Sequence, residues 1–452
     1  MNIVILAAGQ GKRMASSLPK VLHPLAGVPM LLRVLAVAQQ FAPTQCVVVV
    51  GHGGDQVRAA LPADILTAVQ SEQLGTGHAV AQALPLMDAA LPTLVLYGDV
   101  PCLRAADLAQ LVAAAQGGMA VLTARPADPT GYGRMVMNAA GCVTAIVEHK
   151  DCTPAQQADL REINTGVMLL PAHKAAQWLQ ALRPNNAQGE YYLTDCVQLA
   201  NAQGMAVQRV LAAQAWTTEG VNNRSQLAAL ERLHQQDLAE QLMASGVSLA
   251  DPARIDVRGS LHCEQDVTID VGCVFEGTVR IASNARIGAY CVLKDCTIAQ
   301  GAQVLPFSHI DGAQVGENCR IGPYARLRPG TVLAHDCHVG NFVELKNTHM
   351  AAASKANHLA YVGDATIGTR VNIGAGVITC NYDGVNKHRT VIEADAFIGS
   401  NASLVAPVTV GAGATIGAGT TLTKDAPAAQ LTVARAKQAS LAGWKRPVKM
   451  VK

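Results

Sequence analysis

The first 224 residues alternate short apolar runs with segments whose apolar residues recur at helical spacing. The runs at 2–6, 46–50 and 94–97 are almost wholly apolar, which is typical of parallel strands buried on both faces. This alternation predicts an α/β domain whose sheet is covered by helices on both sides. Sheets of this kind bind ligands beyond the carboxyl ends of their strands. Helices are expected at about 30–40, 77–84 and 105–115.

Residues 225–245 contain neither Gly nor Pro, and their leucines recur along one helical stripe. A helix of this length spans about 30 Å. We expect Ser225 as its N-cap and Gly246 as the residue that follows its C-cap. The helix is predicted to link two domains, 1–224 and 246–452.

After Gly246 the apolar pattern changes to a period of six. An apolar residue returns at every sixth position, and Gly often follows it, as at Ile398-Gly399. A six-residue period predicts a parallel β-helix, in which three hexapeptides close one coil and the sixth residues point inside. The span 250–425 then holds about ten coils of about 18 residues each. The period fails near 350–358 and 383–389, where we expect loops that leave the coil.

Composition excludes some classes of function. Lys and Arg number 35 against 33 Asp and Glu, and a formal net charge of +2 argues against a dedicated binder of nucleic acid or of membrane surfaces. No apolar stretch approaches the length of a transmembrane helix, and the N-terminal run lacks the features of a signal peptide. The 12 cysteines show no C-x-x-C spacing and are expected as buried thiols in a reducing, cytoplasmic setting.

The first apolar run ends in a Gly-rich loop, LAAGQGKRM, with Lys20 shortly after it. The loop matches neither GxxxxGK[ST] nor GxGxxG, because Met14 stands where the third Gly of the latter would be. A Gly-rich turn before a helix, with Arg13 and Lys20 beside it, suits a triphosphate. Taken alone, the same residues also fit a tight turn with solvated basic side chains.

The third apolar run ends in Tyr97-Gly98-Asp99. A carboxylate at the carboxyl end of a buried strand lies where ligands bind, and it suits Mg²⁺, a cation that prefers oxygen ligands. The alternative for Asp99 is a cap on the following helix.

The interruptions of the six-residue period gather His, Tyr, Lys and Asn, which a plain scaffold does not need. His358 is the candidate general base, because a neutral imidazole can take a proton from an amine near neutral pH. Cys380 is expected to serve packing. The alternative is a β-helix that acts only as a scaffold or trimerisation device.

The pattern L-x-x-G-x-G-x-x-M followed by P-K and a later G-D resembles the sugar-1-phosphate nucleotidyltransferases. With the hexapeptide β-helix, nearly the whole chain resembles the family of bacterial bifunctional N-acetylglucosamine-1-phosphate uridylyltransferases / glucosamine-1-phosphate acetyltransferases. The resemblance implies a Rossmann-like nucleotidyltransferase domain joined by a long helix to a left-handed β-helix. It also implies a cytoplasmic homotrimer in cell-wall precursor synthesis, with UTP, acetyl-CoA and Mg²⁺. Lys12 departs from the family, which usually has Thr there.

For the N-terminal domain, the resemblance implies roles in nucleotide, sugar and metal binding. The nucleotide contacts are backbone groups at Leu6, Ala7, Ala8 and Gly9, phosphate contacts at Arg13 and Lys20, and uracil contacts at Gln70, Gly75 and Thr76. The sugar-nucleotide and amino-sugar contacts are Tyr97, Gly98, Asp99, Gly133, Glu148 and Asn164, with Tyr192 and Thr194 nearby. The implied Mg²⁺ ligands are Asp99 and Asn222.

For the β-helix, the resemblance implies His358 as base and four binding residues for glucosamine-1-phosphate. These are Arg328 and Lys346 at the phosphate, and Tyr361 and Asn372 at the sugar. The implied acetyl-CoA residues are Ala375, Asn381, Tyr382, Ser400, Ala418 and Arg435. The basic tail from 426 to 452 is either a solvated terminus or a screen for the phosphates of coenzyme A.

The leading hypothesis is a bifunctional enzyme that acetylates glucosamine-1-phosphate and then transfers UMP from UTP. The alternative is a nucleotidyltransferase for another sugar or nucleotide, with the β-helix as an oligomerisation module. A non-enzymatic binding or structural protein would leave the Gly-rich loop and Asp99 without a purpose.

Overall fold

The computed structural model describes residues 1–186 and 188–449. The chain divides into two compact units, Met1–Gln235 and Gln236–Lys452, which we describe separately. Helix α8 (Arg224–Ala244) crosses the division, so the predicted long helix is present. In the part of the chain that the structure describes, no helix is both long and apolar enough to cross a membrane.

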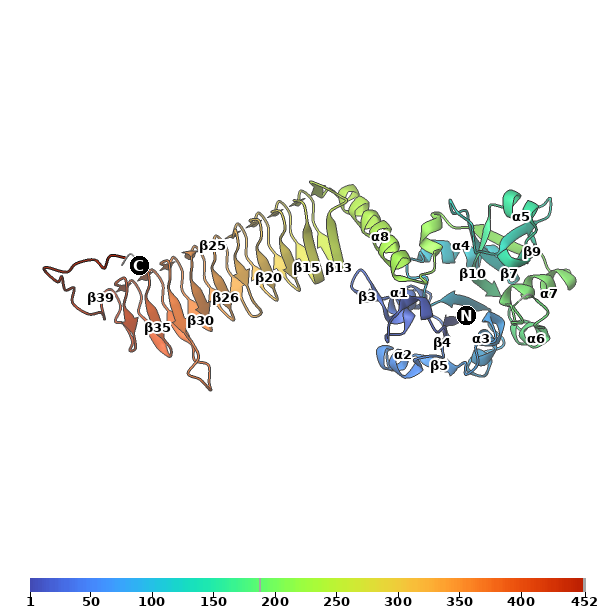
Figure 1. Ribbon diagram of the computed structural model, residues 1–452, viewed down its shortest axis with the longest axis horizontal. Helices are drawn as coiled ribbons and strands as arrows, with labels where there is room; N and C mark the ends of the chain where they lie inside the picture. The colour runs from blue at the N-terminus through green and yellow to red at the C-terminus, as the bar shows by residue number, and fades with distance from the viewer. Residues whose placement is uncertain (187, 450–452) are drawn as a thin grey trace. The chain divides into compact units, whose positions relative to one another are not determined.

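The described part of unit 1 is built on a nine-stranded sheet, visible in blue and green in Figure 1. The three predicted strands are confirmed, and β1 pairs in parallel with both β4 and β6. Strand β10 runs antiparallel between β6 and β7, so the sheet is mixed. The order across the sheet is β5 (Leu66–Val69), β4 (Gln45–Val50), β1 (Asn2–Ala7), β6 (Thr93–Tyr97), β10 (Ile163–Leu170), β7 (Met119–Ala124), β11 (Val207–Leu211), β9 (Val143–Val147) and β8 (Arg134–Met137).

Both faces of this sheet are covered, as the apolar runs predicted. Val4 and Leu6 of β1 belong to a core that includes side chains of α3, α6 and α7, whereas Ile3 and Ile5 belong to a core with α1 and α4. The alternation of side chains along a strand produces these two cores. The helices are α1 (Met30–Gln39), α2 (Gly54–Ala60), α3 (Thr76–Ala83), α4 (Ala105–Ala115), α5 (Pro154–Asp159), α6 (Ala175–Ala181) and α7 (Cys196–Ala202), and a short hairpin pairs β2 (Pro24–Leu25) with β3 (Val28–Pro29).

Helix α8 has a different N-cap from the predicted one, whereas its C-cap is as predicted. Asn223, not Ser225, is the N-cap, because its Oδ1 accepts a hydrogen bond from the Gln226 N–H at 2.8 Å. Ser225 lies inside the first turn, since the helix begins one residue earlier than predicted. At the other end Gly246 has a φ of 97°, and its N–H donates to Met243 O while the Val247 N–H donates to Leu242 O. These two bonds form the predicted Gly-terminated C-cap.

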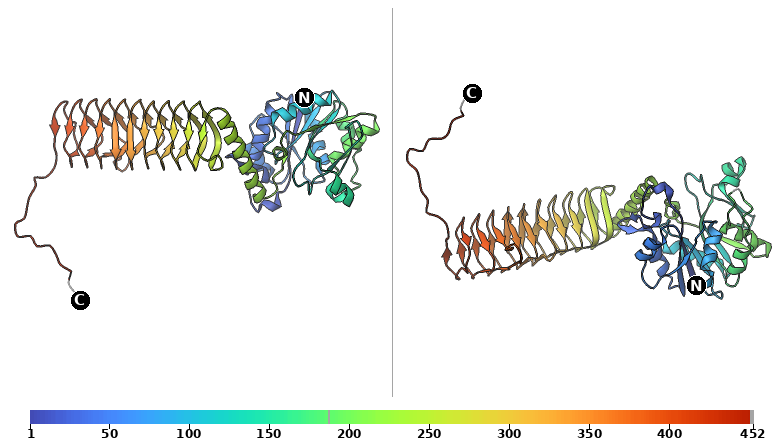
Figure 2. Two further views of the ribbon diagram at one scale, coloured as in Figure 1. Left: turned by 90° about the horizontal axis from the view of Figure 1, so that it is seen from above. Right: turned by 60° about the horizontal axis from the view of Figure 1, so that its bottom comes forward.

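Unit 2 is a parallel β-helix whose coils form evenly spaced rungs in Figures 1 and 2. Thr268 pairs with Arg286 and Arg286 with Gln303, so successive coils take 18 and 17 residues (268 to 286 to 303). The sixth-position residues Ile392, Ile398 and Leu404 are buried, which confirms the predicted repeat. One face of the β-helix is an 11-stranded sheet: β12 (Ser248–Leu249), β14 (Thr268–Ile269), β16 (Arg286–Ile287), β19 (Gln303–Val304), β22 (Arg320–Ile321), β25 (His338–Asn341), β28 (Lys355–His358), β31 (Asn372–Ile373), β34 (Phe397–Ile398), β37 (Thr415–Ile416) and β39 (Leu431–Thr432).

The remaining strands of the β-helix are linked in a single 17-stranded sheet that follows the other sides of the coil. These strands are β13 (Ile255–Cys263), β15 (Cys273–Ile281), β17 (Val292–Lys294), β18 (Thr297–Ile298), β20 (His309–Asp311), β21 (Gln314–Val315), β23 (Arg326–Leu327), β24 (Val332–Leu333), β26 (Glu344–Lys346), β27 (His349–Met350), β29 (Tyr361–Gly363), β30 (Ala365–Ile367), β32 (Ile378–Cys380), β33 (Thr390–Ile392), β35 (Ser403–Val405), β36 (Val408–Val410) and β38 (Thr421–Leu422).

One of the two predicted loops is present and the other is wrong. Between β32 and β33 the chain leaves the coil in the loop 381–389, whose sides meet at a Tyr382–Lys387 bridge. Near 350–358 the chain stays in the coil, and the corner between β27 and β28 is an ordinary one. The period fails there because the step from buried Leu345 to buried Met350 is five residues (345 to 350) instead of six.

Candidate functional site

A cleft of about 230 Å³ lies beyond the carboxyl ends of β1 and β6 in unit 1. This is the position where sheets of this kind bind ligands. The cleft brings together residues from the Gly-rich loop, from the start of α3 and from the end of β6. The sequence-predicted residues that line it are Leu6, Ala7, Ala8, Gly9, Lys20, Gln70, Gly75, Thr76, Tyr97 and Asp99.

The Gly-rich loop turns so tightly that Lys20 packs directly against Gly11. Gly11 has a φ of 61°, and a Cβ at this position would lie 2.6 Å from Lys20 Cβ. Met14 is 1% exposed and packs against Leu25, Met30 and other apolar residues, so it anchors the loop from below. Arg13 and Lys12 are exposed beside the loop and do not line the cleft.

Asp99 and Asn222 direct their side-chain oxygens at one cation. Asp99 Oδ2 lies 2.5 Å and Asn222 Oδ1 3.4 Å from Lys20 Nζ. The Val221 N–H donates to Asp99 O at 2.9 Å and holds the segment with Asn222 against the end of β6. Asp99 is not a cap of α4, because Arg104 occupies the N-cap position of that helix.

This pair of oxygens fits Mg²⁺. Mg²⁺ takes one or two protein oxygens and completes its shell with water and substrate phosphates. The described residues contain no cluster of three His, Cys, Asp or Glu side chains that could hold a metal ion alone. A metal ion here would therefore depend on the ligand for further oxygens.

Two of the three predicted uracil contacts, Gln70 after β5 and Thr76 at the start of α3, are held by hydrogen bonds with neighbouring backbone groups. Gln70 is 3% exposed, and its Nε2 donates to Gly75 O at 3.1 Å. Thr76 Oγ1 accepts a hydrogen bond from the Leu193 N–H at 3.1 Å. Four further residues that line this cleft were not predicted, the apolar Val21 and Ala79 and the polar Gln73 and Glu190, because none belongs to a spaced motif.

The predicted amino-sugar residues surround Glu148. A Cβ on Gly133 would lie 3.3 Å from both Glu148 carboxylate oxygens, so the glycine keeps this carboxylate accessible. The Asn164 N–H donates to Gly133 O at 2.9 Å. Burial raises the pKa of Glu148, and Thr194 Oγ1, 3.4 Å away, opposes the shift by donating to it. A second cavity of about 420 Å³ contains both Glu148 and Tyr192.

Tyr97 and Gly98 complete the end of β6. Burial raises the pKa of Tyr97, so its hydroxyl remains a neutral donor. Gly166 has a φ of 87°, and a Cβ there would collide with the Tyr97 ring. The Gly98 N–H donates to Leu6 O at 2.9 Å, which keeps the loop and β6 side by side.

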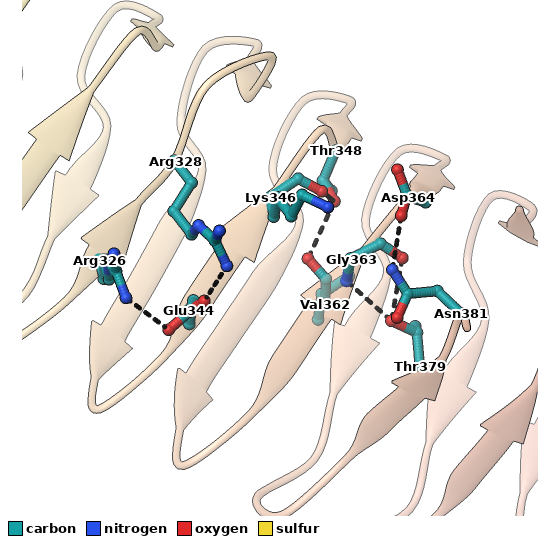
Figure 3. A network of polar contacts seen from close by, with 10 residues as sticks. All are labelled: Arg326, Arg328, Glu344, Lys346, Thr348, Val362, Gly363, Asp364, Thr379 and Asn381. Carbon is teal, nitrogen blue, oxygen red and sulfur yellow. Dashed lines mark hydrogen bonds and ion pairs between the residues drawn. The ribbon is translucent and has the colours of Figure 1, made fainter. Parts of the chain in front are cut away.

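In the β-helix, basic residues gather along the strands that Figure 3 shows. Arg328 and Lys346 lie in neighbouring coils at matching positions, because Arg326 pairs with Glu344 in register. Glu344 Oε1 accepts from Arg328 Nη1 at 2.8 Å. A Cβ on Gly363 would collide with the Tyr361 hydroxyl and the Asn381 amide, so these two groups converge above it.

Lys387 is a cation that sequence reasoning missed. It lies in the loop 381–389, and the positive charge of nearby Lys346 lowers the pKa of Lys387. Like charges held this close indicate a site for an anion. The residue escaped notice because a loop has no periodic signal. Tyr382, in the same loop, is exposed and donates from its hydroxyl to Gly384 O.

His358 lies on a different face of the coil from Lys346. It ends β28 in the 11-stranded sheet, whereas Tyr361 begins β29 in the 17-stranded sheet, beyond a corner at Leu359 with a φ of 50°. His358 Nδ1 is 2.9 Å from Asn341 Oδ1. A groove of about 360 Å³ beside it also contains Arg320 and His338. Asn372 lies on β31, in the same sheet as His358.

Four of the six predicted acetyl-CoA residues, Ala375, Ser400, Ala418 and Arg435, follow His358 along its corner, whereas Asn381 and Tyr382 lie in the loop 381–389 after β32. Three backbone hydrogen bonds define a column along this corner. They run from the N–H groups of Leu359, Asn401 and Gly419 to the carbonyl oxygens of Asn341, Ala375 and Ser400, respectively. At its end Arg435 Nη1 donates to Ala418 O at 2.6 Å. The column of small residues is Ala375, Ser400 and Ala418. The predicted basic tail continues from Arg435 without helix or strand up to 449, and Lys452 lies outside the described residues.

Comparisons with known proteins extend over both units. Residues 3–184 match the MobA-like NTP transferase domain, residues 257–356 the GMPPB C-terminal domain, and residues 389–424 six bacterial transferase hexapeptide repeats. The chain is 60% identical to the bifunctional protein GlmU of Ralstonia nicotianae and 61% to that of Cupriavidus pinatubonensis, over 100% of each chain. It is 58% identical to the bifunctional protein GlmU of Chromobacterium violaceum, over 99% of both chains.

Proposed function

The chain belongs to the bifunctional GlmU family, and from this premise we propose that it makes UDP-N-acetylglucosamine in two steps at separate sites. The β-helix acetylates glucosamine-1-phosphate with acetyl-CoA. The N-terminal domain, 1–224, then transfers UMP from UTP to the product and releases pyrophosphate. The observation that carries the proposal is the convergence of the Tyr361 hydroxyl and the Asn381 amide above Gly363, which pairs in register with Lys346.

Acetyl transfer needs a free amine beside a thioester. Arg328, Lys346 and Lys387 would hold the sugar phosphate, while Tyr361 and Asn372 orient the ring. The amine attacks the thioester carbonyl, the C–N bond forms and the C–S bond breaks. His358 takes the proton from nitrogen, and the departing thiolate is protonated. The column Ala375, Ser400 and Ala418 has side chains small enough to admit the arm of coenzyme A, with Arg435 at its end. Asn381 and Tyr382, in the loop 381–389, would contact coenzyme A from outside this column.

Uridylyl transfer is a displacement between two anions. A phosphate oxygen of the acetylated sugar attacks the α-phosphorus of UTP, and the bond to the β-phosphate breaks. The chain's task is to hold both reactants in line and to offset their repulsion. Lys20 and Arg13 supply positive charge, Gln70, Gly75 and Thr76 select uracil, and Glu148 and Asn164 hold the sugar.

Asp99 and Asn222 would bind Mg²⁺, which on binding supplies charge neutralisation at the phosphates. Both oxygens already point at a cation, the ammonium of Lys20. With Asp99 and Asn222 engaged by Mg²⁺, Lys20 would be free to contact phosphate.

We also propose that the protein is a cytoplasmic homotrimer. The proposal is supported by the placement of His358 and Lys346 in different sheets of the β-helix, because a neighbouring subunit could then complete the acetyl-transfer site. An exposed stack of Tyr290, Phe307, Tyr324 and Phe342 along one corner provides an apolar stripe for association.

The alternative is a nucleotidyltransferase for another sugar phosphate that uses the β-helix as a scaffold. Corner positions of a scaffold need only residues that tolerate the turn. Lys346 and Lys387 repel each other, and the converging Tyr361 and Asn381 groups place polar atoms close together. A scaffold has no need of either feature. The proposal of a second active site accounts for them.

An omission assay tests the proposed function. The protein is incubated with glucosamine-1-phosphate, acetyl-CoA, UTP and Mg²⁺, and each component is left out in turn. UDP-N-acetylglucosamine should form only in the complete mixture. N-acetylglucosamine-1-phosphate should replace the first two components and restore product. Product without acetyl-CoA in the first mixture, or none in the complete mixture, would refute the bifunctional assignment.

A further inference from the structure

A buried carboxylate joins three coils at one corner of the β-helix. Asp364 is 7% exposed, and one of its oxygens accepts a hydrogen bond from Asn347 Nδ2 at 2.6 Å. The other accepts from Asn381 Nδ2 at 2.5 Å, as Figure 3 shows. Each partner is 17 residues away, one coil before and one coil after. The Asp364 N–H also donates to Lys346 O at 2.9 Å. The carboxylate is therefore fixed from three directions.

The turn itself does not require a carboxylate. Asp364 has a φ of 49°, and the same corner position is filled by Gly312 and Gly330 in earlier coils, with φ of 58° and 81°. Asp295 occupies this position in another coil, where it is exposed and accepts from the Thr278 N–H at 2.9 Å. The fold thus accepts glycine or a solvated aspartate at this corner. Burial of an ionised group costs free energy unless something nearby offsets it.

Two cations offset the charge of Asp364. Burial alone would raise the pKa of Asp364, but the Asn347 and Asn381 hydrogen bonds and the charges of Lys346 and Lys387 outweigh it and lower the pKa. In return Asp364 supports the protonated form of Lys387, which its neighbour Lys346 opposes. Two ammonium groups and one carboxylate influence one another here, which leaves an excess positive charge at the place where we expect a phosphate.

We propose that Asp364 is a positioning residue for acetyl transfer, which aims the Asn381 amide at the base of the loop 381–389 and offsets the charges of Lys346 and Lys387 before the sugar phosphate arrives. The inference rests on the proposed function of the β-helix. The proposal explains how the loop 381–389, which leaves the coil, can hold Lys387 near Lys346. Without the anion, the two lysines repel more strongly and Asn381, at the start of the loop 381–389, loses its charged acceptor.

The Asp364→Asn variant removes the charge and retains the size. Its amide nitrogen would oppose the amide of Asn347 or Asn381, donor against donor. We expect the KM for glucosamine-1-phosphate to rise about tenfold or more, with a smaller change in kcat, because a charge-assisted contact preset in the free enzyme is lost. Uridylyl transfer on the same preparation should be unchanged, which excludes general misfolding. Asp295→Asn is the matched control and should leave both activities unchanged.

A pH profile separates positioning from structure. The charged and titratable groups that face Lys387 are Lys346, Asp364 and Tyr361. Removing Asp364 withdraws the influence that favours the protonated lysine. The alkaline fall of kcat/KM for glucosamine-1-phosphate should therefore begin at lower pH in Asp364→Asn than in the unsubstituted protein. An unchanged alkaline limb would overturn the proposal.

A double-mutant cycle with Lys387→Met is a second test of whether Asp364 acts through Lys387. If Asp364 acts through Lys387, adding Asp364→Asn to Lys387→Met should change the KM far less than it does in the unsubstituted protein. Additive losses would show a purely structural role and overturn the proposal. Absence of acetyl transfer in the unsubstituted protein would overturn the proposed function as well, so the two failures are distinguishable.

Discussion

At the scale of single residues, the N-terminal cleft depends on charges that meet only after folding. Lys20, Asp99 and Asn222 are far apart in the sequence, yet their side chains meet at one ammonium group. The structure places the Lys20 ammonium group beside both oxygens, and its positive charge keeps them directed at one point. The carboxylate is the only formal negative charge of this trio.

Asp99→Asn should therefore separate the two activities. We expect uridylyl transfer to fall by about a hundredfold or more, because a charged oxygen ligand is replaced by a neutral one where phosphate charge must be neutralised. Acetyl transfer should be unchanged when it is assayed on the same preparation. Asp55→Asn, in an exposed pair with Arg58, is the control and should affect neither. Equal loss of both activities would indicate a folding defect.

Glu148 gives a prediction for pH. Burial raises its pKa, so the ionised acceptor is lost at a higher pH than for an ordinary Glu, whose pKa is about 4.3. As the pH falls, kcat/KM for N-acetylglucosamine-1-phosphate should drop more steeply in the unsubstituted protein than in Glu148→Gln, which should be low at every pH. The substrate phosphate titrates in both proteins, so the difference between the profiles isolates this carboxylate. Parallel profiles would contradict the assignment.

The residues that could be predicted from sequence are those carried by a motif or a strand end. Asp99 follows an apolar run and Lys20 follows a Gly-rich turn, so both could be predicted from sequence order alone. Lys387 and Asp364 could not, because their role arises from coils that stack 17 residues apart around an irregular loop. The opposition of two ammonium groups is a property of three-dimensional proximity.

At the scale of elements, helix ends test how well local sequence predicts structure. Gly246 was predictable, because few other residues adopt its positive φ without strain. The N-cap was not, because Asn222, Asn223 and Ser225 are all suitable residues within one turn. Packing of Leu230 with Met14 and Val221 sets the register of α8 in unit 1 and leaves Asn223 at the cap.

This correction can be checked directly. Asn223→Ala should cost about 1 kcal/mol of local helix stability, because the Gln226 N–H loses its acceptor. Ser225→Ala should cost nothing or stabilise slightly, since position 225 is helical and Ala favours a helix. Hydrogen exchange of the first-turn amides of α8 measures this locally. Faster exchange in Ser225→Ala than in Asn223→Ala would contradict the assignment of the cap.

The β-helix shows the same limit at the level of a whole strand. A period of six predicts which residues are inside, and the buried side chains agree. A break in the period has two causes that look alike in sequence, an excursion from the coil or a shortened step. The loop 381–389 is the first kind, and the five-residue step from Leu345 to Met350 is the second. Only the stacked registers of β26, β27 and β29 distinguish them.

At the scale of the whole molecule, the acetyl-transfer site raises a question of completeness. His358 shares its corner with Ala375, Ser400 and Ala418, while Lys346 and Lys387 lie on the neighbouring face. The proposed base and the proposed phosphate-binding lysines therefore lie on different faces of one coil, and one substrate could not easily contact both within a single chain. Packing of identical coils side by side would bring the corner of one subunit to the face of the next.

Subunit mixing distinguishes a shared site from a self-contained one. His358→Ala and Lys346→Ala should each abolish most acetyl transfer in a homo-oligomer. When the two variants are refolded together in equal amounts, a site built from His358 of one chain and Lys346 of another recovers, at random mixing, about one quarter of the normal number of sites. A site within one chain recovers none, because every chain lacks one of the two groups. Uridylyl transfer, which uses neither residue, measures refolding in each mixture. Full uridylyl transfer without recovery of acetyl transfer would place His358 and Lys346 in the same self-contained site and remove the main argument for a functional trimer.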